Sequence, residues 1–400
     1  MQQMDLSSLL SRFKEPETLK MAKLGRELRA QGFDITDLSL GEPDFDTPQH
    51  IKKAAIEAIE QNFSHYTPVA GYLDLRQAIC GKLQRDNSLV YTPEQIVVST
   101  GAKQCIANLV LAVVDAGDEV IIPTPYWVTY SEIVKLAGGV PVLVKTKMEN
   151  GFKITPDELE ANISKRTKLF MFSSPCNPTG AVYAEEELQQ LARVFEKHQH
   201  ILIMSDEIYE FINYTGKHFS IAQIPSLQAR TIVINGLSKG YAMTGWRLGY
   251  LAAPVEIAKA CDKIQGQFTS ATCSITQRAA IAALSGDMQP TQMMIEAFKD
   301  RRNLVMGLIN QIPGVVCSEP PGAFYVFPVV KSFLGKKTPD GEVIQNTDEL
   351  CMFLLNKAHV STVTGSAFGE PDCIRISFAN STDNLKKGFA KIKSALDSLS

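Results

Sequence analysis

Short apolar runs alternate with amphipathic stretches through the middle of the chain. From about residue 90, β-branched apolar runs have the length of buried strands. Apolar residues recur at helical spacing in the segments between several of them. Strands that alternate with helices predict a mostly parallel sheet with helices on both faces. The predicted strands are 96–100, 120–123, 140–144, 168–172, 201–205 and 231–234, and the predicted helices are 101–114, 127–137 and 184–198.

The two ends of the chain have a different pattern. A helix is predicted at 17–31, closed by Gly32, and is followed by a short strand at 35–40 and a helix at 49–61. Past residue 290 a long helix, short strands and a last helix predict an α+β unit, at 291–310, 323–327, 360–364, 374–377 and 383–398. We expect residues 1–45 to form an N-terminal segment that belongs partly to a small domain. Residues 46–290 are then the large domain, and 291–400 the rest of the small one.

Composition excludes several classes of protein. The chain is 45% apolar and 21% charged, and its 40 basic and 43 acidic residues give a net charge of −3. This net charge gives no excess of basic residues that would attract nucleic acid or an anionic membrane. No apolar run has the length of a membrane span. The first residues lack a secretory pattern, and the eight cysteines form no C-x-x-C, so we expect a cytoplasmic protein with reduced thiols. The His198 and His200 pair has no acidic or cysteine partner at ligand spacing, so no metal site is predicted.

The stretch NGLSKGYAMTGWRLG, residues 235–249, contains a single lysine directly after the predicted strand 231–234. Open α/β folds place their chemistry at the carboxyl ends of strands. A partly desolvated amine near another cation loses basicity and attacks carbonyl carbons, and Arg247 is suited to a phosphate or a carboxylate. Considered alone, Lys239 is better explained as a lysine on a solvated turn, because most lysines are exposed, so the rest of the chain has to decide between the two interpretations.

Three other loops follow predicted core strands. The turn at Gly101 opens a helix whose free N–H groups favour a phosphate, although many such turns bind nothing. Asn177 stands between two prolines, either of which could follow a cis bond, so the loop either directs the Asn177 amide toward a ligand or is an ordinary loop. Asp206 ends an apolar strand, where a carboxylate is costly unless it is paired. We expect a cationic partner for Asp206, with Tyr209 close enough in sequence to share its pocket.

Together these loops supply a phosphate cradle, a carboxylate, a phenol, an amide, an amine and an arginine. Pyridoxal 5'-phosphate requires this set, because it has a phosphate, a pyridinium nitrogen, a 3-oxygen and an aldehyde. A dinucleotide site would need G-x-G-x-x-G early in the chain, and the glycines at 236, 240, 245 and 249 have the wrong spacing. The loops therefore favour pyridoxal phosphate over a nicotinamide cofactor.

The same residues resemble a known family. Residues 236–249 fit every position of the cofactor-attachment motif of class I pyridoxal-phosphate-dependent aminotransferases. Other motifs of the family occur in the same order between about residues 10 and 398: GEPDFDTP, YTPVAG, NPTG, SDEIY and the arginine at position 375. Within the family the chain is similar to aspartate aminotransferases of subgroup Ib, some of which also act on prephenate. The resemblance implies the fold of the fold-type I transferases: a large domain with a mostly parallel seven-stranded sheet, plus a smaller α+β domain.

The resemblance also implies a role for each motif residue at the cofactor. Lys239 would bind the cofactor covalently and later move the proton, while Asp206 pairs with the pyridinium nitrogen. Tyr209 and Asn177 would hydrogen-bond the 3-oxygen, and Trp127 would pack against the ring. The implied phosphate contacts are Arg247, Ser238 and the amides of Gly101, Ala102 and Lys103. Cys176 and Gly236 depart from common family residues, asparagine and serine.

Substrate and subunit contacts are implied in the same way. Arg375 would bind the α-carboxylate, with help from the Gly41 backbone and from Trp127 and Asn177. Thr18 and Lys103 stand where relatives that act on prephenate bind a second carboxylate; the alternatives are a helix cap and a solvated lysine. Tyr66 would reach the phosphate of another subunit, which implies a homodimer with shared active sites.

The function implied is transfer of an amino group between L-aspartate or glutamate and 2-oxoglutarate or oxaloacetate. Prephenate and arogenate would be a further pair of oxo acid and amino acid. The partners would be small amino and 2-oxo acids. Other enzymes on this fold share the lysine, so a β-lyase, a decarboxylase, a synthase and an aromatic or alanine-type aminotransferase stay open. A regulator with an aminotransferase-like domain would need a DNA-binding module ahead of the motifs, where only about forty residues stand.

Overall fold

A seven-stranded sheet forms the centre of the molecule. The computed structural model describes residues 6–15 and 17–400, and the sheet order is β2-β8-β7-β6-β5-β3-β4. Only β8 runs antiparallel to its neighbours β2 and β7; the other pairs are parallel. The predicted, mostly parallel sheet of seven strands is therefore confirmed. Its strands are β2 Ile96–Ser99, β3 Glu119–Thr124, β4 Val140–Lys145, β5 Thr167–Ser173, β6 Leu202–Asp206, β7 Thr231–Gly236 and β8 Gly249–Ala252.

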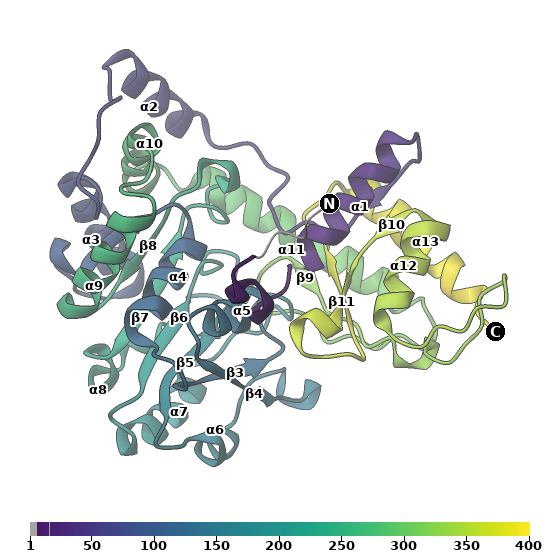
Figure 1. The fold of residues 1–400 in the computed structure, drawn as a ribbon. Helices are drawn as coiled ribbons and strands as arrows, with labels where there is room; N and C mark the ends of the chain where they lie inside the picture. The colour runs from purple at the N-terminus through teal and green to yellow at the C-terminus, as the bar shows by residue number, and fades with distance from the viewer. Residues whose placement is uncertain (1–5, 16) are drawn as a thin grey trace.

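Helices cover both faces of this sheet (Figure 1). Successive strand residues point to opposite faces, so Ile122 packs against one group of helices and Ile121 against another. Inner strands buried on both sides explain why the sequence shows continuous apolar runs there. The helices of this part are α2 Gln49–Glu60, α3 Leu73–Asn87, α4 Ala102–Val113, α5 Thr129–Leu136, α6 Pro156–Asn162, α7 Glu185–Lys197, α8 Pro225–Gln228, α9 Val255–Phe268 and α10 Ser274–Ser285.

The two ends of the chain pack together. In Figure 1 the purple helix α1 lies beside the yellow C-terminal elements. Met21 and Leu38 share one hydrophobic cluster with Phe298, Phe353 and Phe389. Strand β1 pairs in parallel with β10, and β11, β12 and β9 form a second small sheet. These elements are α1 Glu17–Ala30, β1 Thr36–Asp37, α11 Gln289–Ile309, β9 Tyr325–Val326, α12 Thr347–Ala358, β10 Val360–Ser361, β11 Val363–Thr364, β12 Ile374–Ser377 and α13 Thr382–Asp397.

Three predicted strands are shorter than the pattern suggested. The strand expected at 323–327 is reduced to β9, Tyr325–Val326. The strand expected at 35–40 ends at Asp37, because the Asp37 carboxylate accepts a 2.9 Å hydrogen bond from the Ser39 N–H and turns the chain. The strand expected at 360–364 is divided at Thr362 between β10 and β11, which belong to different sheets. Within residues 6–15 and 17–400, no helix has the length and apolar character needed to cross a bilayer.

Candidate active site

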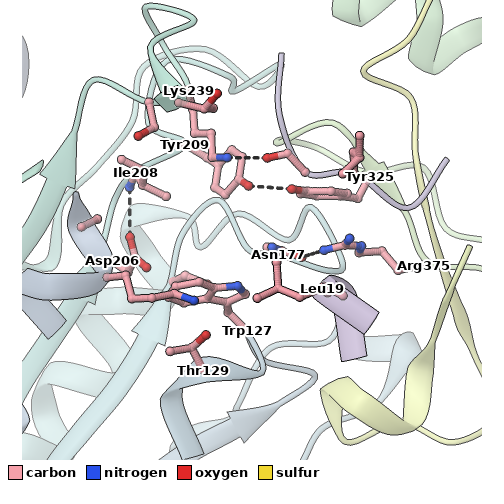
Figure 2. Close-up of a pocket in the computed structure, with 18 of the residues that line it drawn as sticks. Leu19, Trp127, Thr129, Asn177, Asp206, Ile208, Tyr209, Lys239, Tyr325 and Arg375 are labelled. Carbon is pink, nitrogen blue, oxygen red and sulfur yellow. Dashed lines mark hydrogen bonds between the residues drawn. The ribbon is translucent and has the colours of Figure 1, made fainter. Parts of the chain in front are cut away.

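A cavity of about 310 Å³ lies at the carboxyl ends of β5, β6 and β7. Side chains from the central sheet form one wall, and residues of α1, β9 and β12 form the other (Figure 2). Most of the residues that the sequence singled out line it: Thr18, Gly41, Ala102, Lys103, Trp127, Asn177, Asp206, Tyr209, Ser238, Lys239, Arg247 and Arg375. Parallel strands end at the same edge of a sheet, which brings these distant motifs together.

Asp206, the last residue of β6, is a buried carboxylate with hydrogen bonds but no cation. Its side chain is 4% exposed. Oδ2 accepts a 2.6 Å hydrogen bond from the Tyr130 hydroxyl, and Oδ1 accepts one of 3.2 Å from the Ile208 N–H. Burial raises the pKa of Asp206 to about 6, although both hydrogen bonds oppose the shift. No ion pair involves Asp206 within the described part of the chain, so the site is suited to a positively charged ligand atom.

Lys239 directs its amine into the cavity. Nζ donates a hydrogen bond to the Gly41 carbonyl oxygen and lies 5.7 and 5.8 Å from the ring centres of Tyr209 and Phe324. Burial lowers the pKa of Lys239 to about 8; Arg375 and Arg247 act in the same direction, whereas Glu42 opposes the shift. About a tenth of such an amine is neutral at pH 7, far more than for an ordinary lysine, so this nitrogen can act as a nucleophile and a base.

Arg375, in β12, is a guanidinium with an unused donor. The side chain is 2% exposed. Nη1 donates to the Asn177 amide oxygen at 3.0 Å and Nη2 to the Ser39 carbonyl oxygen at 2.5 Å. Nε is buried and has no hydrogen-bond partner among residues 6–15 and 17–400. A buried guanidinium that meets only neutral acceptors favours a carboxylate ligand, which is the predicted role of Arg375.

The other end of the cavity has the features of an anion site. Helix α4 begins at Ala102, directly after Gly101 at φ 87°, and its N-terminus favours negative charge. A Cβ at Gly101 would collide with the Arg247 guanidinium, so the glycine permits the arginine to lie against the helix start. Nη1 of Arg247 donates to the Thr244 carbonyl oxygen at 2.9 Å, and Ser238 lines the same cavity.

Lys103 and Thr18 line the cavity from two different helices, α4 and α1. Lys103 Nζ lies 4.9 Å from the ring centre of Trp127, and burial together with the nearby Arg247 lowers the pKa of Lys103. Thr18 is contributed by α1 from the opposite wall, next to Leu19 and Ala22. The two side chains proposed for a second carboxylate therefore belong to the same cavity.

Two predicted site residues do not line the cavity: Gly101, which lies directly before the lining residue Ala102, and Tyr66. Tyr66 is the more distant case. Its side chain is 97% exposed, in the loop between α2 and α3. Such exposure leaves the phenol free to meet another molecule, as its predicted role requires. The bonds Ser174–Pro175 and Asn177–Pro178 are both cis.

Sequence reasoning missed several lining residues. Tyr130 holds Asp206, the Tyr325 hydroxyl meets that of Tyr209 at 2.7 Å, and Ser39 provides its carbonyl to Arg375. None stands in a recognisable motif; the only signal for Tyr130 is its position one helical turn after Trp127. Within the described residues, no cluster of histidine, cysteine and acidic side chains could hold a metal ion.

Three comparisons relate the chain to known proteins. The sequence model described as aminotransferase class I and II matches residues 34–392. The aspartate/prephenate aminotransferase of Cereibacter sphaeroides is 46% identical over 397 residues, 99% of each chain. An aspartate aminotransferase of Pinus pinaster is 43% identical over 98% of this chain and 80% of its own. The crystal structure of the Rhizobium meliloti aspartate aminotransferase superimposes with a TM-score of 0.96 at 42% identity, covering 100% of both chains.

Proposed function

The chain belongs to the family of class I and II aminotransferases, and we propose that it transfers the amino group of L-aspartate to 2-oxoglutarate with pyridoxal phosphate as cofactor. Prephenate is proposed as a second amino acceptor, because similar proteins are named aspartate/prephenate aminotransferases. The observation that carries the proposal is the Lys239 amine, with its pKa lowered to about 8, between the Asp206 carboxylate and the Arg375 guanidinium in one cavity.

The residues present fit pyridoxal phosphate. Asp206 offers a buried carboxylate to the pyridinium nitrogen, and the start of α4 with Arg247 offers donors to the phosphate. Lys239 would bind the aldehyde carbon, with Tyr209 and Asn177 on the side of the 3-oxygen. When bound, this cofactor receives the amino group and spreads the electron pair left at the substrate α-carbon.

The chain's own residues would bind the substrate and move its proton. The free Nε of Arg375 and its two other nitrogens bind and orient the α-carboxylate. Lys103 and Thr18 bind the distal carboxylate of a dicarboxylic substrate. Nζ of Lys239 takes the α-proton, because its lowered pKa makes the neutral amine far more accessible near neutral pH than that of an ordinary lysine. The indole of Trp127 covers the cavity and excludes water from that transfer.

Apolar residues on the surface support a homodimer as part of the proposal. Ile56 and Ile59 on α2, Leu73 at the start of α3 and Phe268 are all more than half exposed. Tyr66 lies in the loop that joins these two helices. A second copy that covers this surface would receive the Tyr66 phenol at its own cavity. The eight unpaired cysteines support the expected cytoplasmic location, because reducing compartments keep thiols free.

The division at residues 45 and 290 is supported by the hydrophobic clusters. Met288, just before α11, packs with the cluster of α2, α3 and α10. Met294, on the second turn of α11, packs with Met21 and the C-terminal helices. The change between two cores thus falls within a few residues of position 290.

An assay of products tests the function. The purified chain, loaded with pyridoxal phosphate, is incubated with L-aspartate and 2-oxoglutarate, and in parallel with L-aspartate and prephenate. We expect glutamate, and arogenate in the second case, in equal amounts with oxaloacetate. Release of ammonia or carbon dioxide in place of glutamate would identify a lyase or a decarboxylase and refute the proposal.

A further inference from the structure

Tyr325 joins the two functional walls of the cavity without belonging to any motif. It begins β9 and is fully buried, and its backbone is paired with Ser377 of β12, the strand that contains Arg375. Its hydroxyl lies 2.7 Å from that of Tyr209, which follows β6 of the central sheet. Figure 2 shows this contact between two phenols that come from opposite walls.

The ring of Tyr325 also supports Arg375. The guanidinium carbon lies 4.6 Å from the ring centre of Tyr325 and 5.1 Å from that of Phe368. The guanidinium is therefore fixed between two aromatic rings, while its nitrogens reach Asn177 and Ser39. Stacking on aromatic rings restricts an arginine to the plane in which it binds a carboxylate.

The hydroxyl of Tyr325 is placed at a crowded point. A Cβ at Gly41 would come within 2.5 Å of it, and the Gly41 carbonyl accepts the hydrogen bond of Lys239. Only a glycine leaves room for Tyr325 to reach Tyr209 here. The absence of a side chain at Gly41 therefore leaves room for the Tyr325 hydroxyl beside the Lys239 amine.

Either phenol could donate in this contact, and each hydroxyl has a single proton. Burial raises the pKa of both tyrosines, so both phenols are neutral. If Tyr209 gives its proton to the cofactor's 3-oxygen, its own oxygen can only accept, and Tyr325 is then the donor. The hydroxyl proton of Tyr209 then points into the cavity, and a phenol that accepts one hydrogen bond donates a stronger one.

We propose that Tyr325 is a positioning residue for the transamination: its hydroxyl orients the Tyr209 hydroxyl toward the cofactor's 3-oxygen, and its ring holds the Arg375 guanidinium for the substrate carboxylate. The inference rests on the proposed function. The hydroxyl and the ring of Tyr325 have separate roles in it, and these can be tested separately. Tyr325→Phe removes the hydroxyl and keeps the ring, whereas Tyr325→Leu removes both.

The first test is the pH midpoint of the visible absorption of the cofactor-loaded protein. A donor at the 3-oxygen stabilises the deprotonated, more negative form of the chromophore, so a weaker donor raises the midpoint. Loss of a neutral hydrogen bond changes an equilibrium by about two- to tenfold, so Tyr325→Phe should raise the midpoint by roughly 0.3 to 1 pH unit. Tyr91→Phe is the matched control, because the buried Tyr91 hydroxyl has no partner and does not line the cavity.

A double-variant cycle shows whether the effect passes through Tyr209. In a Tyr209→Phe background the hydroxyl of Tyr325 has lost its partner, so adding Tyr325→Phe should leave the midpoint unchanged. Kinetics separate the ring from the hydroxyl. Tyr325→Phe should keep the KM for aspartate within about twofold, while Tyr325→Leu should raise it by roughly three- to thirtyfold through the lost stacking. Thermal midpoints of each variant report folding independently.

Three results would overturn the inference. They are a Tyr325→Phe midpoint equal to that of Tyr91→Phe, an equal shift in the Tyr209→Phe background, and a KM for aspartate that Tyr325→Leu leaves unchanged. Failure of the proposed function is visible separately, because the unsubstituted protein would then form neither the absorption band nor glutamate. If that protein is coloured and active, any of the three results refutes the role of Tyr325 alone.

Discussion

The hydroxyl of Tyr130 donates a 2.6 Å hydrogen bond to Oδ2 of Asp206, and both side chains are almost completely buried. Tyr130 is neutral, so this contact fixes the direction of the carboxylate without cancelling its charge. The carboxylate is therefore held in place at a cost in stability that a cationic ligand would remove.

That cost depends on pH. The folded-state pKa of Asp206, about 6, lies above its ordinary value of 3.8. The folded state thus binds the proton more tightly, and this stabilisation is complete below pH 3.8 and lost as the pH rises through 6. We expect the free energy of unfolding of cofactor-free Asp206→Asn, relative to that of the unsubstituted protein, to rise between pH 4 and 6. The difference should reach about 2–3 kcal/mol by pH 7.

Urea unfolding of both cofactor-free proteins at each pH measures that difference. Asp300→Asn, at an exposed position on α11, is the control. Its free energy of unfolding should change with pH in the same way as that of the unsubstituted protein. A constant gap between the Asp206→Asn and unsubstituted curves from pH 4 to 7 would contradict the assigned environment of Asp206.

The amine of Lys239 sets the pH dependence of cofactor uptake. Only the neutral amine attacks a carbonyl carbon, and the pKa of Lys239 is lowered to about 8. The rate at which cofactor-free protein takes up pyridoxal phosphate should rise about tenfold per pH unit up to pH 8 and level off above it. Stopped-flow absorbance follows the reaction. A rate that still climbs between pH 9 and 10 would show an ordinary lysine.

Replacement of Lys239 by alanine tests its covalent and acid–base roles together. We expect the rate of transamination to fall by at least about 10²–10⁴-fold, since the group that moves the α-proton is lost. Borohydride should no longer fix the cofactor to the protein, which mass spectrometry detects. Lys263→Ala, an exposed lysine on α9, should keep both properties. Fixation of cofactor to the Lys239→Ala protein would assign the attachment to another lysine.

Lys103 should affect dicarboxylic substrates selectively. Its amine lines the cavity beside Trp127, so alanine removes a charged hydrogen bond to the distal carboxylate of aspartate. We expect kcat/KM for aspartate to fall by about 10- to 100-fold, and that for phenylalanine to change by less than threefold. Steady-state kinetics with both amino acids decide the point, and equal losses would refute the specificity role.

A buried ion pair on the other side of β7 should control stability. Lys82 contacts Glu210, whose carboxylate also accepts 2.8 Å hydrogen bonds from Asn87 and Asn235. Lys82→Met leaves a buried carboxylate without a cation and should cost about 3–5 kcal/mol of unfolding free energy. Adding Glu210→Gln should recover part of this loss, because the uncompensated charge is removed.

An exposed ion pair serves as the control for the buried pair of Lys82 and Glu210. Lys393 and Asp397 form an exposed pair on α13, and Lys393→Met should cost less than about 1 kcal/mol. Urea unfolding of the four proteins gives the values. A Lys82→Met loss no larger than that of Lys393→Met would mean that the buried network does not stabilise the fold.

The predictions that came from local chemistry agree with the structure. Apolar β-branched runs predicted β2 to β7. All of these strands are mostly buried except the edge strand β4, and a strand covered on both faces excludes polar residues. The loops at Gly101, Asn177, Asp206 and Lys239 follow such strands, so the fold itself brought them to one edge.

Features that depend on distant contacts were missed. Strand β8, Gly249–Ala252, begins at the last residue of the attachment motif and has only four residues, so its antiparallel pairing with β2 left no pattern to recognise. Tyr130 and Tyr325 look like ordinary core tyrosines in the sequence. Their roles arise because α5 places one hydroxyl on Asp206, and β9 places the other on Tyr209.

The parallel pairing of Thr36 with Val360 has a consequence for synthesis of the chain. On the ribosome, β1 and α1 emerge first, yet the hydrophobic cluster that contains Met21 and Leu38 is built mostly from residues 294–399. The nascent chain can complete the central sheet, with Asp206 and Lys239, before those residues emerge. The wall with Thr18 and Arg375 is completed last, so a nascent chain released before β10 would display the half with the lysine and lack the half that selects its substrate.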